Sequence, residues 1–199
     1  MFGHVIGLFT RPVEEWHAIR AKLENNTCQY TVLVFLLALI PPVCGFIGTT
    51  QFGWKIGTAA ATKLDVRSAL TIAVAYYFVI VLGIFMVGYG IKWMGKTYVK
   101  HVRLSESVAL ATFVAVPLLL VGVFELYPIL WVNFLVGLMA LGYSIYLLYT
   151  GLPILMNIPR EKGFLYASAV LGLGMIALVA MLILTALLWG VGLQPTFAV

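Results

Sequence analysis

Charged side chains are scarce in this sequence. Only 10% of its 199 residues are Asp, Glu, Lys or Arg, whereas 63% are hydrophobic. Soluble domains contain roughly 25% charged and about 45–50% apolar residues. A soluble fold of this length could not bury so much apolar surface. The shortage of charge therefore excludes an ordinary soluble domain and predicts a chain whose solvent is largely lipid.

Cysteine is also rare, and the two cysteines are far apart. Cys28 and Cys44 flank the first apolar run of the chain. At helical rise they would lie about 24 Å apart, whereas the Cα atoms of a disulfide lie within roughly 7 Å of each other. We therefore expect two free thiols and no disulfide framework.

The sequence lacks the usual patterns of catalytic and cofactor sites. His4, His17 and His101 are scattered, without the spacing of metal ligands. There is no Gly-x-Ser-x-Gly elbow, phosphate loop or carboxylate pair. Glu106 and Glu125 lie at opposite ends of one apolar run, about 28 Å apart at helical rise. The centres of the apolar runs contain no ionisable side chain, which disfavours proton-coupled transport. We expect a protein that is not an enzyme and binds no cofactor or metal.

Five long apolar runs dominate the sequence, and each is long enough to cross a bilayer. The predicted fold class is all-α, an integral membrane bundle of five transmembrane helices in residues 29–199, preceded by an N-terminal segment. The spans are expected at residues 30–50, 68–91, 106–124, 129–149 and 164–189.

The N-terminal segment, residues 1–28, is predicted to form one amphipathic interfacial helix. Pro12 near its start and Glu14 and Glu15 in its first turn suit a helix N-terminus. The segment lacks the apolar core, roughly 7–15 residues long, of a cleaved signal peptide. Trp16 lies on the apolar face and is a candidate contact for lipid headgroups or a partner. The alternative is a helix packed beneath the bundle.

The positions of Lys and Arg predict the orientation of the chain. Nine lie in the N-terminal segment and in the connections after the second and fourth spans, and three lie on the other side. This bias places the N-terminus in the cytoplasm and the C-terminus outside. The basic residues form no single block, so nucleic-acid binding is not expected. They are either topology determinants or contacts for anionic lipids and partners. The candidate contacts are Lys96, Lys100, Arg103, Arg160 and Lys162.

Prolines and glycines mark two candidate helix breaks. Pro41 and Pro42 remove two backbone donors in the middle of the first span, which must kink or break there. Broken helices occur at transporter sites, although simple kinks are the alternative. The Tyr-rich stretch GYSIYLLYTGLPILMNIPREKG is predicted to break at Gly151 and Pro153 and again at Pro159, and to turn back into the membrane.

The order of these features resembles the Yip family of small membrane proteins. The resemblance rests on LFTRPVEEW, IPPVCGFIGTTQFGW, YPILW and YLLYTGLPILMNI, and extends over essentially the whole chain. It is strongest for the bacterial inner-membrane branch, which implies an inner-membrane location with a periplasmic C-terminus. Eukaryotic relatives interact with Rab GTPases and act in vesicle trafficking, roles that do not carry over to a bacterial protein. The resemblance implies no catalytic residues.

Two hypotheses about function follow. The first is a non-enzymatic membrane protein that organises lipids or partner proteins at its cytoplasmic face, with a membrane or cytoplasmic protein partner or a homo-oligomer left open. The second is a small transporter or channel for an ion, metabolite or lipid, using the Pro41-Pro42 break and the intramembrane Asn133. A polar cavity that reaches Pro41, Asn133 and tyrosine side chains would favour the second hypothesis. A dry, close-packed bundle would favour the first.

Overall fold

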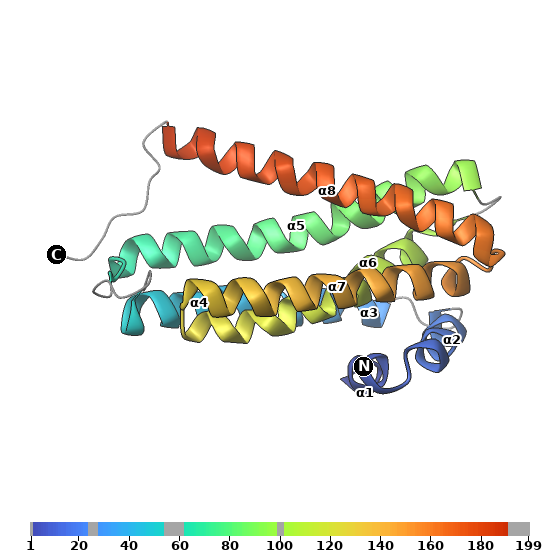
Figure 1. Ribbon diagram of the computed structural model, residues 1–199, viewed down its shortest axis with the longest axis horizontal. Coiled ribbons are helices and arrows are strands. Elements are labelled where there is room, and N and C mark those ends of the chain that lie inside the picture. The colour runs from blue at the N-terminus through green and yellow to red at the C-terminus, as the bar shows by residue number, and fades with distance from the viewer. Residues whose placement is uncertain (1, 24–27, 54–61, 99–101, 191–199) are drawn as a thin grey trace.

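The computed structural model describes residues 2–23, 28–53, 62–98 and 102–190, which are almost entirely helical (Figure 1). Within these ranges, five stretches are long and apolar enough to cross a membrane, so the predicted all-α fold with five spans is confirmed. In chain order the elements are α1 (Phe2–Thr10), α2 (Pro12–Leu23), α3 (Cys28–Leu37), α4 (Ile40–Ile47), the π-helix η1 (Gly48–Phe52), α5 (Val66–Tyr98), α6 (Leu104–Val121), the 3-10 helix η2 (Gly122–Leu126), α7 (Leu130–Leu155) and α8 (Arg160–Gly190).

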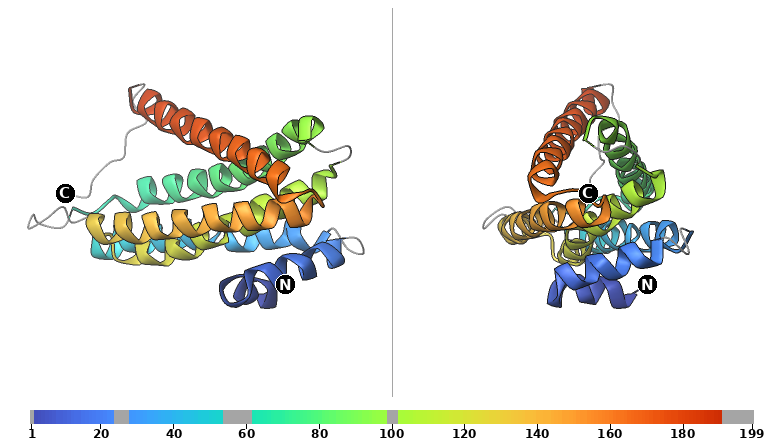
Figure 2. Two further views of the ribbon diagram at one scale, coloured as in Figure 1. Left: turned by 45° about the vertical axis from the view of Figure 1, so that its right-hand side comes forward. Right: turned by 90° about the vertical axis from the view of Figure 1, so that its right-hand side faces the viewer.

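Consecutive spans run in opposite directions, so the bundle has two ends (Figure 1). One end carries α1, α2 and the turn from α7 to α8, and we call it the α2 end. The other carries η1, η2 and the C-terminal end of α8, and we call it the η2 end. In Figure 2, α8 crosses α5 and diverges from α7 toward the η2 end.

The first span is broken ahead of its two prolines. α3 ends at Leu37 and α4 begins at Ile40, with a two-residue turn between them. Pro41 and Pro42 occupy the first turn of α4 and are buried. Because proline has no N–H, neither residue can donate to the carbonyls of the preceding turn. The helical path is disturbed only locally, since the Ala38 N–H donates to the carbonyl of Val34 at 2.9 Å and Leu39 keeps right-handed helical dihedral angles. The predicted interruption is therefore a two-residue turn within one span.

The end of α6 covers this break at close range. A β-carbon on Gly122 would lie 2.6 Å from Cγ and 2.8 Å from Cα of Pro41. Real β-carbons are essentially never found under 3.0 Å from such atoms. Only glycine at this position allows the two spans to approach so closely.

The core of the bundle is built around α6. Leu110, Phe113 and Val116 on this helix are fully buried. By contrast, α5 and α7 direct large apolar side chains outward, such as Phe78 and Met139, which are 64% and 70% exposed. Soluble monomers rarely leave extended apolar faces uncovered. These faces fit a helix surface that is solvated by lipid.

Tyrosine side chains join the later helices to one another. The Tyr149 hydroxyl lies 2.8 Å from Oγ of Ser168, which joins α7 to α8. The Tyr166 hydroxyl donates to the carbonyl of Ile91, and its ring stacks on Tyr98 at a centroid distance of 5.0 Å. The tyrosines therefore satisfy their hydroxyl groups inside the bundle while their rings fill apolar space.

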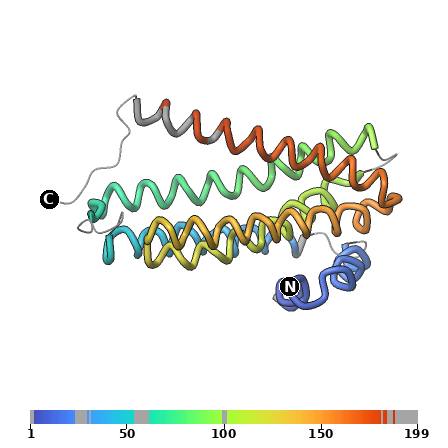
Figure 3. Tube along the Cα trace, in the orientation of Figure 1, coloured from blue at the N-terminus to red at the C-terminus, as the bar shows by residue number. Residues whose placement is uncertain are grey.

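Two of the predicted breaks do not occur. Gly151 and Pro153 both lie within α7, which is continuous to Leu155 (Figure 3). Pro153 falls in the last turn of the helix, where a missing N–H costs a single hydrogen bond. The chain instead turns at Asn157, whose φ of 52° is the left-handed conformation of a helix C-terminus. Pro159 then precedes α8, at the place where the sequence predicted an interruption.

The N-terminal segment contains one more helix than predicted. α2 corresponds to the predicted amphipathic helix, and α1 precedes it. This helix was not predicted, because Gly3 and Gly7 lower the helix propensity of α1 and Pro12 separates it from α2. The buried His4 on α1 contacts Glu15 through Nδ1, and its Nε2 lies 3.0 Å from Nζ of Lys22. These contacts hold α1 against α2.

Candidate functional site

The α2 end is held together by the insertion of one aromatic ring. Trp16 is fully buried, and a β-carbon on Gly151 of α7 would overlap its indole. The ring also meets Phe113 of α6 edge-on, with centroids 6.0 Å apart. The sequence made Trp16 a candidate contact for lipid or a partner. The structure corrects this assignment, because the side chain is enclosed by the protein and anchors α2 beneath the bundle.

Arg20 fastens α2 to the end of α7. Its Nη1 donates to the carbonyl of Ile154 at 3.1 Å and to Oδ1 of Asn157 at 2.9 Å. A cation near the last carbonyls of a helix is favourable because those carbonyls carry partial negative charge. Helices α1 and α2 together form what we call the N-terminal unit. Its helix α1 is also attached to α7, because the Tyr143 hydroxyl donates to the carbonyl of Leu8 at 2.7 Å. The sequence did not identify Arg20, because its partners lie more than 130 residues away.

An open groove of about 1020 Å³ lies between α2, the end of α7 and the start of α8. We call it the α2 groove. Its charged residues are Arg20, Arg160 and the acidic Glu161, and its apolar wall includes Phe164 and Leu165. Both apolar side chains are 60% exposed. The groove thus places two guanidinium groups beside an apolar surface.

Three other basic candidates lie at the same end but outside the groove. Lys96 is exposed in the last turn of α5, and Lys162 is exposed in the first turn of α8. Arg103 is exposed immediately before α6, and its backbone N–H donates to Oε2 of Glu106 at 3.2 Å. Lys100 lies outside the described residues. Of the four predicted basic contacts that the structure describes, Arg160 is the one that lines the groove.

At the η2 end, two glycines bring the first span against a carboxylate. A β-carbon on Gly48 would overlap the backbone carbonyl of Glu125, and one on Gly45 would lie 2.7 Å from Glu125 Oε2. The Tyr76 hydroxyl of α5 donates to Glu125 Oε1 at 3.1 Å. Three spans therefore meet around the Glu125 side chain.

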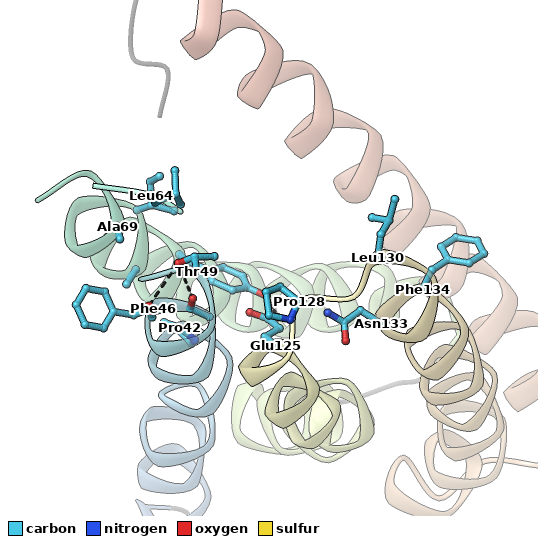
Figure 4. A pocket seen from close by; sticks show the side chains of 14 residues that line it. Pro42, Phe46, Thr49, Leu64, Ala69, Glu125, Pro128, Leu130, Asn133 and Phe134 are labelled. Carbon is cyan, nitrogen blue, oxygen red and sulfur yellow. Dashed lines mark hydrogen bonds between the residues drawn. The ribbon is translucent and has the colours of Figure 1, made fainter. Parts of the chain in front are cut away.

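Glu125 lines a pocket of about 440 Å³, which we call the η2 pocket (Figure 4). Asn133 extends from α7 toward Glu125 and Pro128, and its Oδ1 is buried without a hydrogen-bond partner. The Thr49 hydroxyl is already engaged, because it donates to the carbonyl of Gly45 at 2.7 Å. The remaining walls are mostly apolar and aromatic. They include Pro42, Phe46, Ile72 and Phe134.

Sequence reasoning identified this pocket in part. Pro42 and Asn133 were candidates, but Tyr76 and Glu125 were not. Glu125 comes near the end of a span, where a carboxylate is ordinarily exposed at the membrane surface. The glycine face of α4 and η1 that encloses it could have given a signal, because Gly45 and Gly48 follow the double proline at helical spacing. The pocket meets the criterion for the transport hypothesis only in part, because it reaches Asn133 and Tyr76 but not Pro41 and its walls are mostly apolar.

The described residues contain no group of three or more His, Cys, Asp and Glu side chains that could hold a metal ion. Across the ranges that the structure describes, Glu125 forms no ion pair, since the two ion pairs found join His4 to Glu15 and Arg11 to Glu14. What the two sites offer chemically is recognition of charge. The α2 groove has two arginines and one glutamate, so its net charge is positive, and the η2 pocket presents hydrogen-bond acceptors.

Comparisons with protein families and with known proteins both indicate a membrane protein of the Yip1 type. The Yip1 domain matches residues 6–193. Two relatives, from Escherichia coli (strain K12) and Escherichia coli O6:H1, are both named inner membrane protein YohC. Each is 41% identical over 190 residues, which cover 96% of this chain and 97% of the relative. Neither name is that of an enzyme. No solved structure matches the chain significantly.

Proposed function

Since the chain belongs to the Yip1 domain family and is similar to inner membrane proteins, we propose that it binds and organises anionic phospholipids at the cytoplasmic face of the inner membrane. In this proposal the α2 end is that face, and α1, α2 and the turn from α7 to α8 form the binding surface. The protein catalyses no reaction.

The proposed orientation follows from charge. Nine of the twelve Lys and Arg residues belong to the segments of the α2 end, and three belong to the opposite side. Basic residues are retained preferentially in the cytoplasm during membrane insertion. The N-terminus is therefore assigned to the cytoplasm and the C-terminus to the periplasm.

The observation that carries the proposal is the pairing of Arg20 and Arg160 with an apolar wall in the α2 groove. A guanidinium group has five N–H donors, so Arg20 retains donors beyond those used on α7. Two guanidinium groups suit the oxygen atoms of a lipid phosphate. The exposed Phe164 and Leu165 then provide an apolar surface for the attached acyl chain.

The N-terminal unit also makes this surface rigid. The burial of Trp16 against α7 and the two bonds of Arg20 fix α2 before any lipid arrives. A preformed site loses less conformational entropy on binding than a flexible one. Outside the groove, Lys96, Arg103 and Lys162 extend the positive charge of the α2 end.

The experiment compares lipid retention by matched variants. Detergent-purified protein is mixed with equal amounts of phosphatidylglycerol and phosphatidylcholine, and bound lipids are counted by native mass spectrometry. We expect the wild type to prefer phosphatidylglycerol. Arg160→Gln should reduce that preference about fivefold, which corresponds to about 1 kcal/mol. Lys162→Gln removes the same charge from the same turn of α8 but lies outside the groove, so its effect should be under twofold.

Equal losses in the two variants would mean that net charge alone attracts the lipid, and the groove would then have no special role. Equal retention of the two lipids by the wild type would overturn the proposal altogether. The transport hypothesis rests on a different observation, the pocket at the η2 end, and is unaffected by either result.

A further inference from the structure

The η2 pocket encloses an acidic group for which the bundle supplies no cation within the described residues. Oε1 of Glu125 accepts one hydrogen bond, from Tyr76, and Oε2 faces the backbone at Gly45. Placing a carboxylate among apolar side chains is costly unless a partner compensates it. Ionisable residues within spans therefore commonly mark the binding of a ligand or an ion.

We propose that the η2 pocket binds a primary organic ammonium ion that carries a short apolar chain. An ammonium group has three N–H donors and no acceptor. The pocket offers the Glu125 carboxylate and the Tyr76 hydroxyl oxygen as acceptors, and the side-chain amide of Asn133 lies beside them with its Oδ1 unpartnered. The carboxylate neutralises the charge, the Tyr76 oxygen accepts a second N–H, and the Asn133 oxygen accepts a third once the amide has rotated to face the ligand.

The walls of the pocket determine the rest of the ligand. Phe46 and Phe134 give it aromatic surface, which attracts cations and also covers hydrocarbon. Its volume of about 440 Å³ falls within the range of roughly 300–1,000 Å³ for small-molecule sites. A dehydrated calcium ion fits poorly, because it requires about 6–8 oxygen ligands and most of the pocket wall is apolar. An alkylammonium group matches both the acceptors and the apolar walls.

The backbone around the pocket is arranged to create this site. Helix α4 begins at the Pro41-Pro42 pair, and Gly122 at the end of α6 has no side chain to prevent close packing against Pro41. Gly45 and Gly48 then leave room for Glu125 on the adjacent face of α4 and η1. The double proline and the two glycines of IPPVCGFIG thus act together to hold one carboxylate in the pocket.

Two sources could provide the ammonium group, a free amine or the ethanolamine headgroup of a phospholipid. Both share the chemistry that the pocket recognises. The experiment therefore uses the full-length protein in nanodiscs of phosphatidylcholine, whose headgroup has no N–H donor. The probe is hexylammonium, and hexanol and hexyltrimethylammonium are the comparison ligands. Binding is measured by the rise of the unfolding temperature with ligand concentration and by saturation-transfer NMR.

We expect saturable binding of hexylammonium that is at least tenfold tighter than that of either comparison ligand. Hexanol lacks the charge, and hexyltrimethylammonium lacks the N–H donors. Glu125→Gln keeps the size of the side chain but removes its charge, and should weaken hexylammonium binding about tenfold or more. The control is Glu106→Gln, at the other end of α6. It should bind within twofold of the wild type, since glutamine can still accept the bond from the Arg103 N–H.

A second variant keeps the test informative if Glu125→Gln does not fold. Asn133→Leu removes one acceptor from the first turn of α7 and should weaken hexylammonium binding without weakening that of hexanol. Nanodiscs that contain phosphatidylethanolamine then distinguish the sources. Competition by this lipid identifies the headgroup as the ligand, and unchanged hexylammonium affinity identifies a free amine. Equal binding of hexylammonium and hexanol, or an unchanged affinity in both pocket variants, would overturn the proposal.

Discussion

The indole of Trp16 lies directly against Gly151 in α7, where any β-carbon would overlap the ring. This contact joins the N-terminal unit to the Tyr-rich part of the bundle, although the two residues are far apart in the sequence. The Trp16 Nε1 is buried without a hydrogen-bond partner. The contact therefore depends on shape and apolar burial, and not on the polar edge of the indole.

The first prediction concerns this contact. Gly151→Ala should lower the free energy of unfolding by about 1–3 kcal/mol, because the added methyl group must displace the indole or α2. Thermal unfolding in detergent measures the effect. The control, Gly142→Ala, lies on the same helix with no atom within 4 Å of the new β-carbon. It should leave stability unchanged or raise it by up to about 1 kcal/mol.

The second prediction concerns Arg20. Arg20→Met keeps much of the length of the side chain but removes its bonds to Ile154 and Asn157. Hydrogen bonds from a charged donor are worth roughly 1.5–3 kcal/mol, so amide hydrogen exchange in α2 should accelerate about tenfold or more. Arg11→Met is the control, since Arg11 is exposed and its contact is with Glu14 at 3.6 Å. Equal acceleration in both variants would contradict the docking role of Arg20.

The third prediction tests the proposed orientation. In a background with both native cysteines replaced by alanine, Lys162→Cys at the α2 end should resist a membrane-impermeant maleimide in cells with a permeabilised outer membrane. It should react after the inner membrane is disrupted. Lys63→Cys, on the opposite side of the bundle, should react before disruption. The reverse pattern would place the N-terminus in the periplasm and remove the assignment of the α2 groove to the cytoplasmic face.

The fourth prediction concerns the approach of η1 to η2. Gly48→Ala should destabilise the protein by roughly 1–3 kcal/mol, because the new methyl group meets the backbone carbonyl of Glu125, which cannot rotate away. It should also weaken hexylammonium binding. Gly83→Ala, in α5 with open space around the new β-carbon, should do neither. A stable Gly48→Ala variant with unchanged binding would show that the close packing is unnecessary for the pocket.

The features that depend on one-dimensional patterns were predictable from the sequence. Five apolar runs gave the five spans because each must cover the hydrocarbon core on its own. The double proline gave the break in the first span, since the missing N–H groups are a property of the residues themselves. Helix ends were less accurate. α7 continues past Gly151 and Pro153 because neither residue removes enough hydrogen bonds to end a helix whose last turn packs on α2.

Features that depend on which helices meet were not predictable in the same way. The apolar face that contains Trp16 could have faced lipid or protein, and both choices bury similar apolar area. Glu125 looked like an ordinary carboxylate at the end of a span. Its enclosure depends on Gly45 and Gly48 from another helix, and on Tyr76 from a third. Such a site arises from tertiary packing, so the sequence contained its components without indicating that they meet.

The break between α3 and α4 has a consequence for how the protein is made. The donors that would close the helix at Pro41 and Pro42 are absent from the covalent chain, so no later packing event can supply them. Val32–Phe52 is nevertheless long and apolar enough to cross a membrane as one span. The interruption is therefore present in that span before α6 and η2 are synthesised. The later packing of Gly122 against Pro41 covers an interruption that already exists and does not cause it.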